Sequence, residues 1–164
     1  MRIGVLGGSF DPVHRGHLDL ARSAVRRLRL ERLLVVPARR SPFKGARPVA
    51  ARHRLAMLRL AFRGIPKARI SPMELRRPAP SYTVDTLRAL RRRHPKAEIV
   101  LLVGTDAARD FSKWHRASGI RRLASLAVFP RRIRVSSTGI RKGGAGLPAA
   151  VAAYARRHGL YGRG

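Results

Sequence analysis

The sequence predicts a doubly wound α/β fold, in which a parallel sheet carries helices on both faces. Apolar runs of strand length alternate along the chain with segments whose apolar residues recur every three or four positions. The run at 97–104 is apolar throughout its centre, which is typical of a parallel strand buried on both faces. Neither an internal repeat nor a linker interrupts the 164 residues, so a single domain over 1–164 is expected.

The strands are predicted from short runs of aliphatic residues that end at glycine, proline or charge. Connections through helices make the strands parallel, with right-handed crossovers. The predicted strands are residues 1–6, 32–37, 68–71, 97–104 and 125–130.

The helices are predicted from apolar residues at helical spacing, such as Val84, Leu87 and Leu90 in the third of them. Ser81 is a candidate N-cap for that helix, and Gly159 is a candidate C-cap for the last. The predicted helices lie within residues 16–29, 49–62, 82–94 and 147–162, and the last of them ends at Gly159.

Three loops rich in glycine, proline and charge follow predicted strands, at 7–17, 38–48 and 104–116. In open parallel sheets, ligands bind outside the carboxyl ends of the strands. We therefore expect these loops to form one shared site.

The charge of the chain is extreme, with 37 Lys and Arg against 8 Asp and Glu and a formal net charge of +29. Such a surface attracts polyanions, so non-specific nucleic-acid binding is expected as a side property. The arginines are nevertheless spread over amphipathic helices, aromatic residues make up only 5%, and no motif of a nucleic-acid-binding fold is present.

The absence of cysteine excludes disulfides and thiolate metal sites and favours a reducing cytoplasmic location. The opening MRIGVLGGSF holds too few apolar residues for a signal peptide, and no apolar run approaches the length of a membrane helix. We expect no association with a membrane.

The first loop, GGSFDPVHRGH at 7–17, has the features of an anion site. Gly7 and Gly8 let the backbone approach a ligand, and the amides that open the next helix lie at the positive end of its dipole. The loop lacks the Gly-Lys-Ser/Thr of a P-loop and the spacing of the dinucleotide fingerprint.

His14 and His17 stand about one helical turn apart in this loop. The pair allows three interpretations: metal ligands, a structural pair, or donors to phosphate oxygens. No further ligand has companion spacing for a metal, so the metal interpretation is weak. The anion-binding character of the loop favours phosphate.

A second phosphate-binding candidate is VSSTGIRKGG at 135–144, where three hydroxyl residues precede Arg141. Hydroxyls and backbone amides bind phosphate, and arginine adds bidentate charge. A serine-capped helix explains the same residues in isolation. The anion-binding features of the first loop favour the phosphate interpretation of this segment over the capping one.

GGSFDPVHRGH and SSTGIR together resemble the paired signatures of the nucleotidyltransferase superfamily with an H-x-G-H motif. SPFK, PSYTVDTL, VGTDAARDFSKWHR and HGLY further resemble the bacterial nicotinate-nucleotide adenylyltransferases. The resemblance runs from Met1 to Tyr161 and implies a Rossmann-like nucleotidyltransferase fold.

The resemblance implies adenylyl transfer from ATP to nicotinate mononucleotide, giving deamido-NAD and pyrophosphate without a covalent enzyme intermediate. Mg²⁺ would arrive with ATP. The sister reactions, with nicotinamide mononucleotide or phosphopantetheine as acceptor, remain alternatives, as does a basic nucleic-acid-binding protein on a degenerate scaffold.

The resemblance also implies roles for individual residues. Those implied as catalytic are His14, His17, Lys44 and Arg141. Those implied to bind ATP are Gly7, Gly8, Ser9, Phe10, Gly104, Asp106, Ser136, Ser137 and Thr138. Those implied to bind nicotinate mononucleotide are Tyr82, Thr83, Asp85, Trp114 and His115. A surface position for Lys44 and a core position for Trp114 are the competing interpretations.

The chain departs from the family pattern in two respects. Phe43 stands where the family has a histidine before the loop lysine, and the segments 130–135 and 142–148 are shorter than in the family. The resemblance does not explain the basic charge.

Overall fold

Five parallel strands form the predicted sheet in the computed structural model, which describes residues 1–43 and 47–162. The strand order is β3-β2-β1-β4-β5. All neighbouring strands pair in parallel, with Val5 of β1 opposite Leu34 of β2 and Leu101 of β4. The strands are β1 Arg2–Gly8, β2 Arg32–Pro37, β3 Ala68–Ile70, β4 Glu98–Gly104 and β5 Ser125–Phe129. The sheet confirms the α/β prediction.

The order places a switch point between β1 and β4, because the chain runs outward from β1 to β3 and then returns to start the other half beside β1. Loops on the two sides of such a point turn away from each other above the carboxyl ends of the strands and leave room for a ligand.

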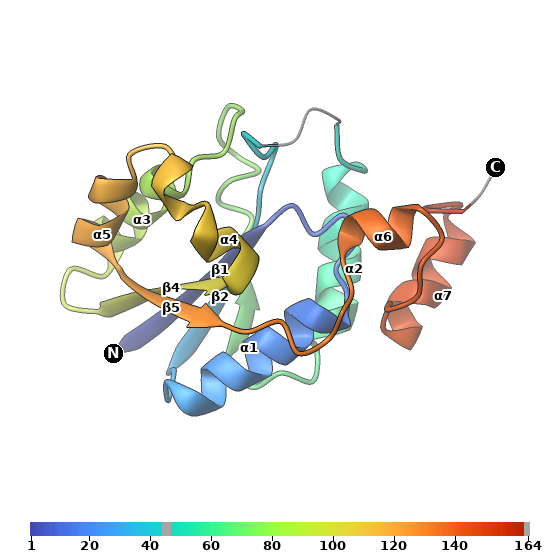
Figure 1. Ribbon diagram of the computed structural model, residues 1–164, viewed down its shortest axis with the longest axis horizontal. Helices are drawn as coiled ribbons and strands as arrows, with labels where there is room; N and C mark the ends of the chain where they lie inside the picture. Colours follow the sequence, from blue (N-terminus) through green and yellow to red (C-terminus); the bar gives the residue numbers. More distant parts are fainter. Residues whose placement is uncertain (44–46, 163–164) are drawn as a thin grey trace.

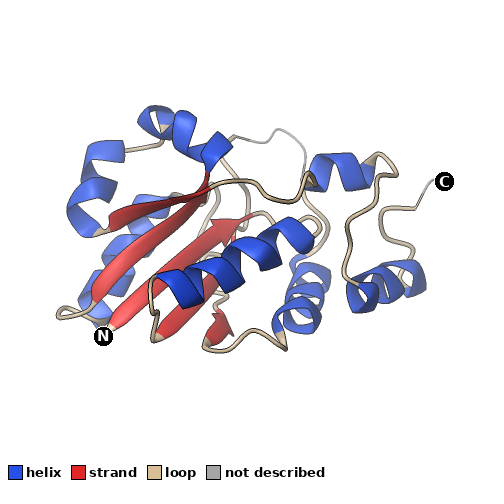
Figure 2. Ribbon diagram, turned by 60° about the horizontal axis from the view of Figure 1, so that its bottom comes forward, coloured by secondary structure: helices blue, strands red, loops and turns tan. Residues whose placement is uncertain are grey.

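Helices cover both faces of the sheet (Figure 1, Figure 2). The helices are α1 Arg15–Arg27, α2 Ala51–Phe62, α3 Thr83–Arg93, α4 Thr105–Arg109, α5 Ala117–Leu123, α6 Ser137–Arg141 and α7 Ala149–Arg157, with a 3₁₀ turn η1 at Phe111–Lys113. Successive residues of β2 show how both faces are covered: Leu33 and Val35 belong to the cluster under α1, α2 and α7, whereas Leu34 and Val36 belong to the one under α3 and α5. Both faces of each central strand are thus buried, which accounts for their continuous apolar runs.

The structure corrects several local predictions. Ser81 does not cap α3, whose N-cap is Tyr82; the Ser81 hydroxyl instead accepts from the backbone N–H of Arg39 at 2.9 Å. The C-cap of α7 is His158, one residue before the predicted Gly159, and Gly159 has the left-handed φ of +60° that glycine adopts just after the end of a helix. The predicted loop at 104–116 contains α4 and η1.

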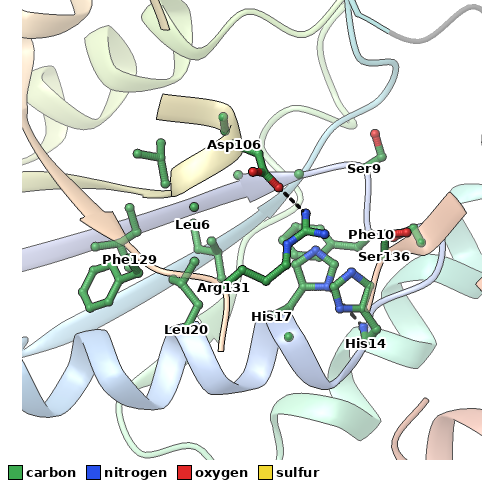
Figure 3. Close-up of a pocket in the computed structure, with 18 of the residues that line it drawn as sticks. Leu6, Ser9, Phe10, His14, His17, Leu20, Asp106, Phe129, Arg131 and Ser136 are labelled. Atoms are coloured by element: carbon green, nitrogen blue, oxygen red, sulfur yellow. Dashed lines mark hydrogen bonds and ion pairs between the residues drawn. The ribbon is translucent and has the colours of Figure 1, made fainter. Parts of the chain in front are cut away.

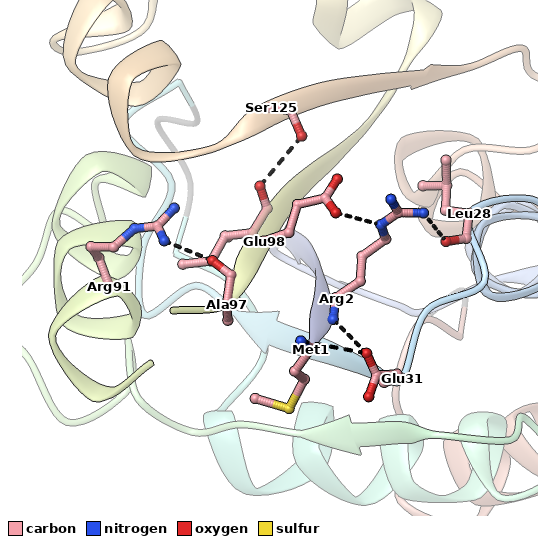
Figure 4. Close-up of polar contacts among 9 residues, drawn as sticks. Met1, Arg2, Leu28, Glu31, Arg91, Ala97, Glu98 and Ser125 are labelled. Atoms are coloured by element: carbon pink, nitrogen blue, oxygen red, sulfur yellow. Dashed lines mark hydrogen bonds and ion pairs between the residues drawn. The ribbon is translucent and has the colours of Figure 1, made fainter. Parts of the chain in front are cut away.

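The amino ends of the strands are held by polar contacts (Figure 4). Arg2 Nε lies 2.8 Å from Glu98 Oε2, and the Arg2 backbone N–H donates to Glu31 Oε1 at 2.9 Å. These groups lie at the opposite end of the sheet from the predicted loops. Within the described residues, no helix is long and apolar enough to cross a membrane.

Candidate active site

A cavity of about 520 Å³ opens at the carboxyl ends of the strands. Segments that follow β1, β2, β4 and β5 line it, so the expected shared site is present as a space (Figure 3). The predicted residues that line it are Gly7, Gly8, Ser9, Phe10, His14, His17, Thr83, Gly104, Asp106, Trp114, Ser136, Ser137 and Thr138.

The two histidines stand where α1 begins, with His14 as its N-cap. Their rings stack with centroids 3.7 Å apart, and the backbone N–H of His14 donates to His17 Nδ1 at 3.1 Å (Figure 3). A nitrogen that accepts a hydrogen bond carries no proton, so the proton of a neutral His17 is on Nε2. The cap therefore sets the tautomer of His17 and makes Nε2 a donor.

Gly16 explains the glycine of the H-x-G-H pattern. A Cβ at this position would lie 3.1 Å from Cε1 and Nδ1 of the His14 ring and 3.2 Å from a methyl of Val135. Both distances are shorter than ordinary van der Waals contacts. A glycine here lets the His14 ring and the start of the second motif pack directly against α1.

The second motif is bonded to the first loop across more than 120 residues of sequence. Ser137 Oγ donates to the carbonyl of Pro12 at 2.8 Å, and the Arg141 guanidinium donates to the carbonyl of Asp11. Ser136 caps α6 by accepting from the Gly139 N–H at 3.0 Å, so the capping interpretation is confirmed for that serine. The two motifs are therefore a single structural unit.

Arg141, which the resemblance implies to be catalytic, is not among the residues that line the cavity. Its guanidinium bonds the Asp11 carbonyl, and its second amino group donates to Thr138 Oγ1 at 3.2 Å. In this arrangement Arg141 holds the first loop and the Thr138 hydroxyl in place.

Arg54 is a buried residue whose guanidinium holds backbone carbonyls near the site, and the sequence did not single it out. It is only 2% exposed and donates to the carbonyls of Ser9, Ala38 and Val49 at 2.7, 2.8 and 2.9 Å. Burial lowers the pKa of its guanidinium, partly offset by the nearby carboxylate of Asp11. The sequence could have indicated its burial, because Arg54 stands three residues before a buried residue of α2 and so lies on the apolar face of that helix.

Asp11 connects the first loop to the C-terminal segment. The hydroxyl of Tyr161 donates to Asp11 Oδ1 at 2.6 Å, and the Val49 N–H donates to the same oxygen at 3.3 Å. Burial, followed by the bond to Asp11, raises the pKa of Tyr161 far above its usual value. The phenol therefore remains a donor at neutral pH.

On the β4–β5 side, Asp106 is paired with an arginine of the shortened segment. Arg131 Nη2 lies 2.7 Å from Asp106 Oδ2, and Arg109 Nη1 lies 3.9 Å from Oδ1 (Figure 3). Apolar side chains of Leu6, Leu20 and Phe129 complete this wall. The sequence did not indicate Arg131 as a site residue, because segment 130–135 is shorter than in the family and so offers no matching family residue.

Another side of the cavity is formed by the loop after β2, the start of α3 and the residue after η1: Thr83 and Trp114 line it, and the Phe43 ring lies 6.2 Å from that of Trp114. Tyr82, Asp85 and His115 do not line it. Tyr82 and His115 pack against each other with ring centroids 4.2 Å apart.

The same side contains a buried carboxyl, Glu74, which the sequence did not single out. It lines the cavity at 6% exposure, and burial raises its pKa above the ordinary value. Asp85, in contrast, is half exposed and paired with Arg88 at 3.1 Å.

Two further expectations concern Lys44 and metals. Lys44 lies outside the described residues. Across 1–43 and 47–162, no group of three His, Cys, Asp or Glu side chains is placed to hold a metal ion.

Comparison with known proteins adds a family. Residues 5–143 match the model of the cytidylyltransferase-like family. A probable nicotinate-nucleotide adenylyltransferase of Thermus thermophilus is 39% identical over 187 positions, which cover 98% of this chain and all of the relative. One of Gemmatimonas aurantiaca is 44% identical over 131 residues, covering 80% of this chain and only 62% of the relative, so the chain spans about six tenths of that protein.

Among solved structures, the chain resembles a Plasmodium falciparum nicotinic acid mononucleotide adenylyltransferase complexed with NaAD. The TM-score is 0.78 at 18% identity, covering 98% of this chain and 97% of the other. At that identity the likeness supports the fold. The 187 aligned positions with the Thermus protein exceed the 164 residues of this chain, so the alignment contains gaps on the side of this chain.

Proposed function

This chain belongs to the cytidylyltransferase-like family and, within it, to the nicotinate-nucleotide adenylyltransferases, and we propose from that premise that it transfers adenylate from ATP to nicotinate mononucleotide. The products are deamido-NAD and pyrophosphate. The observation that carries the proposal is the cavity in which the H-x-G-H loop and the SSTGIR segment meet as one bonded unit.

The reaction is a displacement at phosphorus. A phosphate oxygen of the mononucleotide attacks the α-phosphorus of ATP, the bond from that phosphorus to the α/β bridging oxygen breaks, and pyrophosphate leaves. The attacking oxygen is already deprotonated at neutral pH, so no general base is needed. The enzyme contributes position and charge stabilisation.

His17 supplies the donor where charge develops. Its Nδ1 is occupied by the His14 N–H, so Nε2–H faces the phosphates and bonds the oxygen that becomes part of the leaving group. His14 packs against it and keeps the ring in that orientation. The donor needs no reorganisation during the reaction.

The triphosphate is held by both motifs. Backbone amides at Gly7 and Gly8 and the hydroxyls of Ser136 and Thr138 line the cavity and bind phosphate oxygens. Lys44 adds charge from the second loop. A divalent cation, Mg²⁺, enters with ATP as part of the substrate.

The two nucleosides occupy different parts of the cavity. Asp106 accepts from the ribose hydroxyls of ATP, and Leu20 and Phe129 pack beside its adenine. Thr83 and Trp114 bind the acceptor, with Trp114 stacking on the nicotinate ring. The cytoplasm, where ATP is abundant, is the proposed location.

The test is an acceptor panel. Purified protein, ATP and Mg²⁺ are incubated separately with nicotinate mononucleotide, nicotinamide mononucleotide and phosphopantetheine, and CTP replaces ATP in a parallel series. The proposal predicts dinucleotide and pyrophosphate in equal amounts, with the highest kcat/KM for nicotinate mononucleotide. A higher kcat/KM for phosphopantetheine or with CTP contradicts it.

A further inference from the structure

We propose that Glu74 is a positioning residue for the acceptor substrate: it fixes the wall of the cavity made by residues 71–83. This inference rests on the proposed function, because it assigns that wall to the nicotinate mononucleotide. Neither the H-x-G-H loop nor the SSTGIR segment involves this residue.

Glu74 is held from one side by a chain of hydrogen bonds. Thr86 Oγ1, 1% exposed, donates to Glu74 Oε1 at 2.5 Å, and Arg77 Nη2 donates to Thr86 Oγ1 at 2.5 Å. Thr86 belongs to the first turn of α3, whereas Glu74 and Arg77 belong to the segment before it. These hydrogen bonds thus join the segment to the start of α3, where Thr83 lines the cavity.

The segment is also bonded to the loop after β2. The Ser81 N–H donates to the carbonyl of Arg40 at 2.9 Å, Ser81 Oγ accepts from the Arg39 N–H at 2.9 Å, and Arg39 Nη1 donates to the carbonyl of Arg77 at 3.2 Å. Both segments line the cavity, through Ser41 and Phe43 on one and Ser81 on the other. Glu74 adds to this network the buried bond that joins the segment to α3, so its loss removes that anchor while the bonds to the loop after β2 remain.

Burying the carboxyl of Glu74 costs free energy, so a buried glutamate in the cavity wall points to a role for that carboxyl. Burying a carboxyl disfavours its charged form, and its raised pKa reflects that cost. The other cavity-lining acids, Asp19 and Asp106, are less buried. An apolar residue would fill the same volume without the cost but could not accept from Thr86. What the carboxyl adds is a fixed position for the acceptor wall.

The test measures acceptor and ATP binding separately, without turnover. Trp114 is the sole tryptophan and lines the cavity, so its fluorescence reports binding of either nucleotide. We compare Glu74→Ala with Glu74→Gln, whose amide oxygen still accepts from Thr86, and Thr86→Val with Thr86→Ser, which keeps the hydroxyl. Glu98→Gln, at the far end of the sheet, is the control carboxylate.

We expect Glu74→Ala and Thr86→Val to raise the Kd for nicotinate mononucleotide about tenfold to a hundredfold, the range for a lost buried hydrogen bond to a charged group. Glu74→Gln, Thr86→Ser and Glu98→Gln should stay within about threefold of wild type, and the Kd for ATP should change less than about twofold in all five.

Two results overturn the inference: an unchanged acceptor Kd in both disruptive variants, or an equal rise in the Kd for ATP, which indicates general destabilisation. Because Thr86→Val is nearly isosteric, it decides the matter if Glu74→Ala does not fold. If wild type binds ATP but not the mononucleotide, the proposed function itself fails. If wild type binds both and the variants match it, only the role of Glu74 fails.

Discussion

Removing the hydroxyl of Tyr161 tests whether the C-terminal segment stabilises the nucleotide loop. Tyr161→Phe keeps the ring, which packs against the core cluster, and deletes only the donor to Asp11 Oδ1 at 2.6 Å. Asp11 is 7% exposed, so water cannot fully replace that donor, and the Val49 N–H at 3.3 Å is a weak substitute.

A hydrogen bond to a buried charged group contributes roughly 1.5–3 kcal/mol, so we expect Tyr161→Phe to lower the free energy of unfolding by about 2 kcal/mol. For a chain of this size the melting temperature should fall by about 4–8 °C. Urea denaturation followed by circular dichroism measures the change.

Tyr154→Phe is the matched control, because its hydroxyl lies 2.9 Å from Nδ1 of His53, an imidazole and not a buried carboxylate. It should cost about 0.5–1 kcal/mol. Equal losses in the two variants, or a loss below about 0.5 kcal/mol in Tyr161→Phe, would show that the buried Asp11 does not depend on this donor.

Four further outcomes are expected. His17→Ala should lower kcat about 10²–10³-fold with an intact fold by circular dichroism, and a kcat within about tenfold of wild type would remove His17 from the chemistry. Arg131→Gln and Asp106→Asn, made singly and together, should change the KM for ATP non-additively because the two groups pair at 2.7 Å; additive effects would show that the pair is not coupled. Burial raises the pKa of Glu74 above 4.5, so the folded state binds this proton more tightly than the unfolded state, and wild type should lose stability relative to Glu74→Gln as pH rises from about 4.5 toward 7; parallel stability curves would contradict this. With a net charge of +29, the protein should bind RNA with a steep loss of affinity as salt rises, and a flat salt dependence would argue against charge-driven binding.

The sheet could be predicted because its signal is local. β1, β2, β4 and β5 are apolar runs that end at glycine or proline, and β4 is buried on both faces, so its sequence is apolar without interruption. The short helices α4 and α5 could not be predicted, because five and seven residues are too few to show a period.

The histidine loop was predictable because glycines, histidines and a strand end coincide within one short stretch of sequence. Its connection to Ser137 and Arg141 was not, since hydrogen bonds to the carbonyls of Pro12 and Asp11 depend on tertiary structure. Ser81 illustrates the same limit: its side chain bonds the loop after β2, a partner 42 residues away that no local capping pattern indicates.

The most direct test of the account is the initial rate of deamido-NAD formation from ATP and nicotinate mononucleotide, measured for wild type and His17→Ala at equal folded concentration. We expect rapid formation by wild type, with one pyrophosphate released per dinucleotide, and a rate about 10²–10³-fold lower in the variant. No dinucleotide from wild type above the rate of the variant would contradict it.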